Sequence, residues 1–192
     1  MDIIDSTMLE EKGERSMQTY ADTKAQTWQS EASPCLAMKC WARRAIVGGV
    51  VSGLVFISFQ MFFCWLVKGS FFEPMRLISA MVMSRNAVEA WYPLLVAVPY
   101  GVAVHLVLSV LFAGIFTAFV VRHPFFAASF TRLVFIACVY GFLLWIINFY
   151  CVATLVGWSW FPDRTDPFFQ GFIAHVFLYG AVLGVYLNGR LR

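Results

Sequence analysis

Four long apolar runs without a charged side chain constrain this chain more than any other feature of its sequence. The runs cover residues 45–67, 94–121, 133–161 and 167–189. Each is longer than the roughly 20 residues that a helix needs to cross a hydrocarbon core about 30 Å thick. Lipid cannot satisfy exposed backbone groups, so such runs fold as helices. The sequence therefore predicts an all-α integral membrane protein, a bundle of four transmembrane helices at about residues 45–67, 94–121, 133–156 and 168–188.

The composition agrees with this fold class and excludes several functions. Hydrophobic residues make up 60% of the chain and charged residues 13%, against about half and a quarter in soluble proteins. Nucleotide-binding loops, zinc-protease helices and nucleophile elbows are missing, and the five cysteines have no metal-binding spacing. The net charge of +3 is spread over the helix flanks. The sequence thus predicts no catalytic residue, no metal, no nucleic-acid partner and a lipid bilayer as the immediate surroundings.

The basic residues beside the spans predict the orientation, because loops that stay in the cytoplasm are enriched in Lys and Arg. Seven basic residues flank one face: Lys39, Arg43, Arg44, Arg122, Arg132, Arg190 and Arg192. Four flank the other: Lys68, Arg76, Arg85 and Arg164. With an even number of spans both termini share a side, which this distribution predicts to be the cytoplasm.

Residues 1–44 differ sharply from the membrane domain at residues 45–192. They carry seven acidic and six basic residues and little hydrophobic periodicity. This composition predicts a polar cytoplasmic arm, which is either a disordered tail or a helix held by a neighbouring chain. The arm is accordingly a candidate contact with other membrane subunits.

The second pair of spans repeats features of the first, which indicates a duplicated helical hairpin. Gly53 precedes Gln60 by seven residues, and Gly141 precedes Asn148 by the same interval. The two other spans each contain a G-x-x-x-H arrangement, at Gly101 and His105 and at Gly171 and His175.

The polar residues of these repeats form the candidate site: Gln60, His105, Asn148 and His175. Each should point into the bundle, since an unpaired amide or imidazole facing lipid costs a few kcal/mol. Three interpretations remain open. The four residues can fix helix packing by hydrogen bonds, line a proton or ion path, or, through His105 and His175, ligate a haem.

Eight glycines in the apolar runs predict close helix packing: Gly48, Gly49, Gly53, Gly101, Gly141, Gly171, Gly180 and Gly184. Without a side chain they let two helix backbones approach and gain dispersion contacts, which replace the hydrophobic drive that lipid does not supply.

The long loop between the first two spans is a second candidate site. Residues 74–88 have helical spacing with one apolar face, which predicts an interfacial helix in the outer leaflet. Four charged residues of the outer loops are candidates for binding lipid headgroups or for clamping the loops together: Glu73, Arg76, Arg85 and Arg164.

The order of features in residues 45–188 resembles the YagU-like family of small bacterial inner-membrane proteins. The resemblance rests on the glycine-rich first span, the long outer loop, the stretch from His105 to Ser109 followed by Phe112-Ala113, and Trp160-Phe161-Pro162 leading to Ala174-His175-Val176-Phe177. It implies a bacterial inner-membrane location, four helices and a link to acid tolerance. It supplies no catalytic residues.

These observations predict a non-catalytic four-helix protein that is an accessory or structural subunit of a larger inner-membrane assembly for electron transfer, photosynthesis or transport. The first alternative is a small proton- or ion-linked transporter or stress-tolerance protein that uses His105 and His175. The second is an electron carrier with a haem between these two histidines. The leading hypothesis requires no cofactor.

Overall fold

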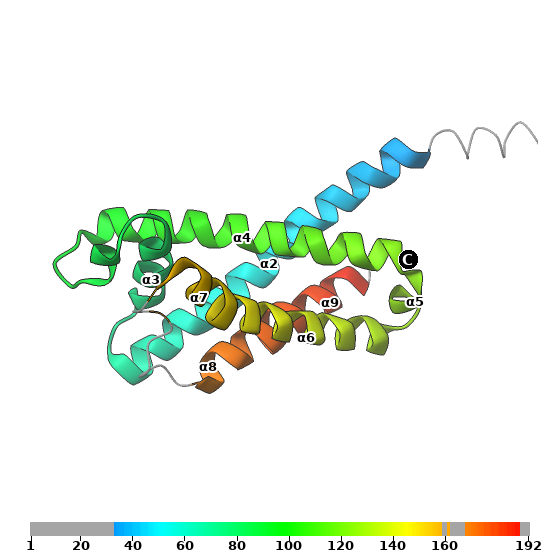
Figure 1. Cartoon of the computed structure of the whole chain (residues 1–192). Helices are drawn as coiled ribbons and strands as arrows, with labels where there is room; N and C mark the ends of the chain where they lie inside the picture. The colour runs from blue at the N-terminus through cyan, green and yellow to red at the C-terminus, as the bar shows by residue number, and fades with distance from the viewer. Residues whose placement is uncertain (1–32, 159–160, 162–167, 189–192) are drawn as a thin grey trace, which may run out of the picture. The chain divides into compact units, whose positions relative to one another are not determined.

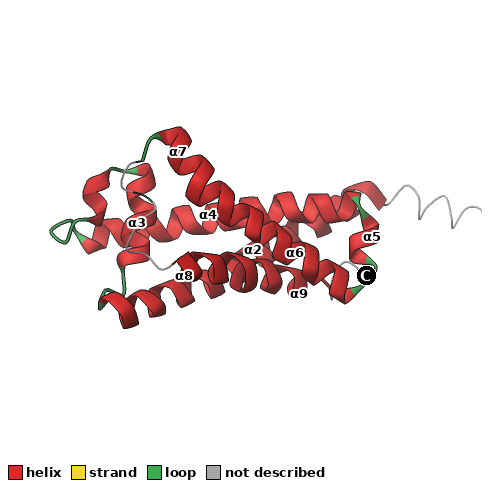
Figure 2. Ribbon diagram, turned by 60° about the horizontal axis from the view of Figure 1, so that its bottom comes forward, coloured by secondary structure: helices red, strands yellow, loops and turns green. Residues whose placement is uncertain are grey.

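A computed structural model describes residues 33–158, 161 and 168–188 of the chain. Ala42–Arg192 form one compact unit. In the described residues all regular structure is helical (Figures 1 and 2). The elements are α2 (Ser33–Lys68), α3 (Glu73–Val82), η1 (Arg85–Val88), α4 (Leu94–Arg122), α5 (Pro124–Ala127), α6 (Phe130–Ile146), η2 (Ile147–Val152), α7 (Ala153–Val156), α8 (Phe168–Ile173), η3 (Ala174–Ala181) and α9 (Val182–Asn188).

Four helices are long and apolar enough to cross a membrane, which confirms the predicted fold class. They are Trp41–Lys68, Leu94–Arg122, Phe130–Val156 and Phe169–Asn188. The third helix is made of α6, η2 and α7, and the fourth of α8, η3 and α9. The helix α2 begins at Ser33 and so includes the last part of the predicted arm. Residues 1–32 of that arm lie outside the described residues.

Glycine and proline set several helix ends. Gly69 follows α2 with φ +68°, and Gly157 follows α7 with φ +75°, a left-handed conformation that glycine adopts without steric cost and that commonly ends helices. Pro93 directly precedes α4, and Pro124 is the first residue of α5. At the beginning of a helix the N–H groups have no intrahelical partner, so a proline there costs no hydrogen bond.

Two stretches of the transmembrane helices are π-helical. They are Ile147–Val152 in the third helix and Ala174–Ala181 in the fourth. A π-helix hydrogen-bonds from i to i+5, so each turn holds one more residue than an α-helical turn; such segments are rare and occur often at functional sites. The apolar runs gave no sign of them, because uniform hydrophobicity does not report the helical period.

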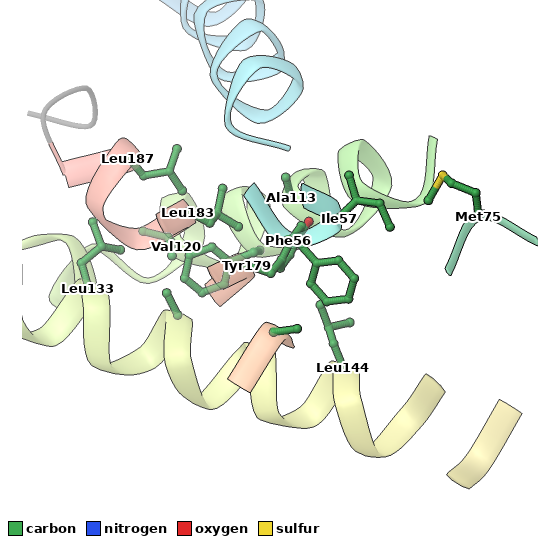
Figure 3. Packing of buried hydrophobic residues seen from close by; sticks show 13 residues of the cluster. Phe56, Ile57, Met75, Ala113, Val120, Leu133, Leu144, Tyr179, Leu183 and Leu187 are labelled. Atoms are coloured by element: carbon green, nitrogen blue, oxygen red, sulfur yellow. The ribbon is translucent and has the colours of Figure 1, made fainter. Parts of the chain in front are cut away.

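The core contains side chains from all four transmembrane helices (Figure 3). Phe56 of α2, Leu144 of α6 and Tyr179 of η3 lie together at one level of the bundle (Figure 3). Leu133 and Leu187 are fully buried at another. The fourth helix packs against α6 through glycine, since a methyl group on Gly180 would collide with the carbonyl oxygen of Ala137.

The helical part of the loop between the first two spans packs on protein. Met75 and Ser79 of α3 have no exposed surface, and the Ser79 hydroxyl donates a hydrogen bond of 2.9 Å to the carbonyl oxygen of Ala97 in α4. Gly101 leaves room for the backbone of Met75. The predicted helix at residues 74–88 is thus divided into α3 and the short η1, and α3 lies against the beginning of α4 (Figure 1).

Candidate functional site

A cavity of about 80 Å³ lies among the four transmembrane helices. Its polar lining consists of His105, Ser109, Asn148, His175 and Tyr179. Its apolar lining consists of Phe56, Leu108, Phe112 and Leu144. Three of the four predicted site residues, the two histidines and Asn148, therefore meet at one place, and Gln60 does not.

His105 is fixed by the backbone of the first helix. Its Nε2 lies 2.9 Å from the carbonyl oxygen of Gly53. Because a carbonyl only accepts, Nε2 carries the proton and Nδ1 is the lone-pair nitrogen of the neutral ring. The Ser109 hydroxyl lies 3.5 Å from the same Nε2, at the outer limit for a hydrogen bond.

His175 has the opposite tautomer. Its Nδ1 lies 2.8 Å from the carbonyl oxygen of Gly171, one turn earlier, so Nδ1 carries the proton and Nε2 is the acceptor. The side chain is only 8% exposed and lines the cavity. Among the described residues no group donates to this Nε2. A buried imidazole thus presents an unused lone pair at the cavity.

The ring of Phe56 contacts both imidazoles. It stacks on His105 with ring centroids 5.4 Å apart and an interplanar angle of 27°. It meets His175 edge to face at 4.7 Å and 85°. Phe149 contacts the same His175 ring at 5.6 Å. These contacts fix the rings, so neither histidine can turn without displacing an aromatic neighbour.

Both hairpins bring the glycine of their first helix to the histidine of their second. The Gly53 carbonyl accepts a hydrogen bond from His105, and a methyl group on Gly141 would collide with the carbonyl oxygen of His175. The second repeated pair does not correspond. Asn148 lines the cavity, whereas Gln60 bonds to the fourth helix.

Gln60 is paired with Gln170, a residue that the sequence reasoning did not single out. The Gln170 amide donates to Oε1 of Gln60 and lies 3.5 Å from Sγ of Cys64. Gln170 is a polar residue within the fourth apolar run, so the criterion that selected Gln60 would also have found it. Its side chain is buried and connects α8 to α2.

Two tyrosines that were also not selected attach their helices to α4. The hydroxyl of Tyr179 donates to the carbonyl oxygen of Ser109 at 2.5 Å, and that of Tyr140 to the carbonyl oxygen of Phe112 at 2.8 Å. The sequence does not indicate that these tyrosines form buried hydrogen bonds, because tyrosine near a span is typical of the headgroup region.

Each of the eight predicted glycines lies against a neighbour. Gly49 faces the α4 backbone at Val110, where an added methyl group would come within 2.7 Å of Cα. A methyl group on Gly48 would lie 3.0 Å from Leu183 and Tyr186, and one on Gly184 would lie 2.9 Å from Ala137. Gly171 lies beside the Trp145 indole.

Two of the charged loop residues, Arg76 and Glu73, bind to other parts of the loop between the first two spans or to the end of α2. Arg76 donates to the backbone carbonyl of Glu89 at 2.7 Å and to that of Ala87 at 3.3 Å. Glu73 forms an ion pair of 2.8 Å with Lys68. Arg85 is exposed, and Arg164 lies outside the described residues.

The arrangement does not fit a haem between the two histidines. Nε2 of His105 is occupied by the Gly53 carbonyl, and Phe56 contacts both rings. The cavity of about 80 Å³ is smaller than the roughly 150 Å³ that accommodates benzene, so a macrocycle would require displacement of the core. Within residues 33–158, 161 and 168–188, no three His, Cys, Asp or Glu side chains form a metal-binding group.

No protein-family model, no curated protein and no solved structure matches this chain. Its four long apolar helices identify it as a multi-pass membrane protein.

Proposed function

We propose that the protein is a non-catalytic subunit of a larger assembly in the bacterial inner membrane, with α4 as its contact with a neighbouring helix. The proposal rests on the open space beside Gly114. Gly114 is the one glycine within the four described spans where an added methyl group would meet nothing within 4 Å. Every other glycine in these spans accommodates a neighbour, so Gly114 is a close-packing position to which the described residues supply no neighbour.

The surroundings of Gly114 suit a transmembrane partner. Ala118 lies one turn further along α4 and is exposed, so the two residues form a small-x-x-x-small pair, a pattern that lets helices approach closely. Leu111 and Val107, on the preceding turns of the same face, are 54% and 67% exposed. A second helix would find a shallow depression at Gly114 between larger apolar side chains.

Two further features support the location that we propose. The excess of Lys and Arg beside one set of helix ends favours cytoplasmic termini. The resemblance of residues 45–188 to the YagU-like proteins implies the bacterial inner membrane. The polar arm would then lie on the cytoplasmic side, where other subunits can bind it.

The test is site-specific photo-crosslinking in native membranes. A photoreactive residue at position 114 should give a defined heavier product with a neighbouring subunit. The same residue at Ser58, which is exposed on α2, is the matched control and should give little product. With the photoreactive residue at position 118 instead, Gly114→Ile should abolish the crosslinked product. The same substitution should not lower the thermal stability of the purified chain. Equal yields at 114 and 58, or a product unaffected by Gly114→Ile, would contradict the proposal.

A second candidate is transport of a small solute or of protons through the histidine pair. The observation in its favour is that His105 and His175 line one cavity together with Ser109 and Asn148. Flux into liposomes should fall in both His105→Leu and His175→Leu while the fold is retained. Gln60→Leu is the control, because Gln60 lies away from the cavity. Unchanged flux in both histidine variants would exclude this role.

A further inference from the structure

We infer that the central cavity binds one small, neutral organic molecule that both donates and accepts hydrogen bonds, such as a short amide. The inference goes beyond the proposed subunit role and holds with or without a partner chain. It rests on the cavity's unused polar groups, its size and its lack of charge.

Two polar groups are available to such a molecule. Nε2 of His175 has a lone pair, because the Nδ1–H group donates a hydrogen bond to the carbonyl oxygen of Gly171. The side chain is more than nine-tenths buried. The Asn148 amide offers both a donor and an acceptor, and among the described residues none forms a hydrogen bond with it. Asn148 is half-buried, and its amide faces the cavity beside the buried His175. A ligand that donates to His175 and accepts from Asn148 uses both groups.

The volume limits the size of the ligand. About 80 Å³ is roughly half the cavity that takes up benzene, a molecule of six heavy atoms. A molecule of about three or four heavy atoms is the largest that fits without repacking.

The lining favours a neutral ligand over an ion. None of the nine lining side chains is a carboxylate, an ammonium or a guanidinium group. An ion transferred to such a place loses its hydration and gains no opposite charge, which is strongly unfavourable. The rings of Phe56 and Phe112 and the side chain of Leu144 instead offer dispersion contacts to a short apolar group.

The cavity is also close to the surface. Leu108 lines it and is 37% exposed on the outer side of α4. The side chain of Leu108 thus belongs both to the cavity lining and to the surface of the protein.

The experiment measures the 15N chemical shift of His175 Nε2 in the full-length protein, labelled with 15N-histidine and reconstituted in lipid nanodiscs. Three probes of similar size are titrated: acetamide, which donates and accepts; acetone, which only accepts; and acetate, which is charged. Acetamide should cause a saturable shift of this nitrogen towards the value of a hydrogen-bonded acceptor. Acetone and acetate should not, and the His105 signals should change less.

Two variants test the site itself. Asn148→Leu removes the second polar group and should weaken the acetamide response at least tenfold. Leu144→Phe fills the cavity and should abolish the response. This variant tests the site independently if Asn148→Leu does not fold. Gln60→Leu, away from the cavity, should leave it unchanged. A wild-type response that does not saturate, equals that of acetone, or persists in Leu144→Phe would overturn the inference and leave water as the only occupant.

Discussion

At the scale of single residues, the glycines show how one missing methyl group determines a helix contact. Gly141 lies directly against the carbonyl oxygen of His175, whereas Gly114 faces open space. Both are inside transmembrane helices, so their intrinsic helical preferences are the same and only the surroundings differ. A comparison of Gly141 with Gly114 therefore separates the contribution of helix packing to stability from that of helix propensity.

We predict opposite effects of alanine at these two positions. Gly141→Ala forces α6 away from η3 and should lower the free energy of unfolding by about 1 to 3 kcal/mol, the usual range for overpacking. Gly114→Ala adds a methyl group in open space and should leave stability unchanged or raise it by up to about 1 kcal/mol. Reversible unfolding in mixed micelles measures both. Equal gains at both positions would show that helix propensity, rather than the contact with His175, determines the result.

The sequence identified the residue types of the cavity better than their partners. His105, Asn148 and His175 could be selected because polar groups in apolar runs require partners. The carbonyl oxygens of Gly53 and Gly171 could not be predicted as those partners, since every residue offers the same backbone group. Phe56 carries no signal either, because one phenylalanine among 20 in the chain is not distinguishable from the others by type.

At the scale of helices, the hydrogen-bonded amides of Gln60 and Gln170 connect α2 to α8. An amide exposed to lipid has no hydrogen-bond partner, and each of these two side chains supplies the partner of the other. This interdependence makes the pair suitable for a double-mutant cycle.

We predict that Gln60→Leu and Gln170→Leu are each destabilising and that the double variant recovers part of the loss. The coupling energy should be about 0.6 to 2 kcal/mol, the range for hydrogen bonds between membrane helices. Tyr140→Phe, combined with Gln60→Leu, is the additive control, since Tyr140 bonds to α4 elsewhere. Unfolding of the wild type, the two single variants and the double variant in micelles gives the coupling. Strict additivity of the two leucine substitutions would mean that the amides do not support each other.

The positions of the helices in the sequence were more predictable than the rotation of each helix about its own axis. Uncharged runs specify the number and approximate limits of the spans, because hydrocarbon thickness sets helix length. They do not specify which side chains face inward. The π-helical segments at Ile147–Val152 and Ala174–Ala181 change the phase of the residues around them, so a periodicity of 3.6 does not place Asn148 or His175. The packing of α3 on α4 likewise depends on Gly101, for which the sequence predicts close packing but not the partner, the backbone of Met75.

At the scale of the whole molecule, the fourth helix differs from the other three. In its most apolar window 56% is buried within the protein, against 28% for each of the others, and it is the least hydrophobic. It also contains Gln170 and His175. The other helices are exposed mainly to lipid, whereas this one depends on protein neighbours.

We predict that the fourth helix enters a membrane poorly by itself. Placed alone in a carrier protein, residues 168–188 should insert less efficiently than residues 94–121, because Gln170 and His175 add an unfavourable transfer free energy that no neighbour offsets. Replacing both by Leu should restore insertion, as measured by accessibility of flanking cysteines from each side. Similar insertion of the two unmodified segments would contradict the prediction.

The two π-helical segments have a consequence for where related chains can gain or lose residues. Because a π-helical turn holds one residue more than an α-helical turn, removing one residue there leaves an unbroken α-helix, whereas the same deletion in α4 rotates all later residues of that helix by about 100°. Single-residue insertions and deletions in this lineage should therefore concentrate at 147–152 and 174–181. These segments border the cavity, so each such length change would exchange the side chains that line it and give related chains a different internal chemistry within the same four spans.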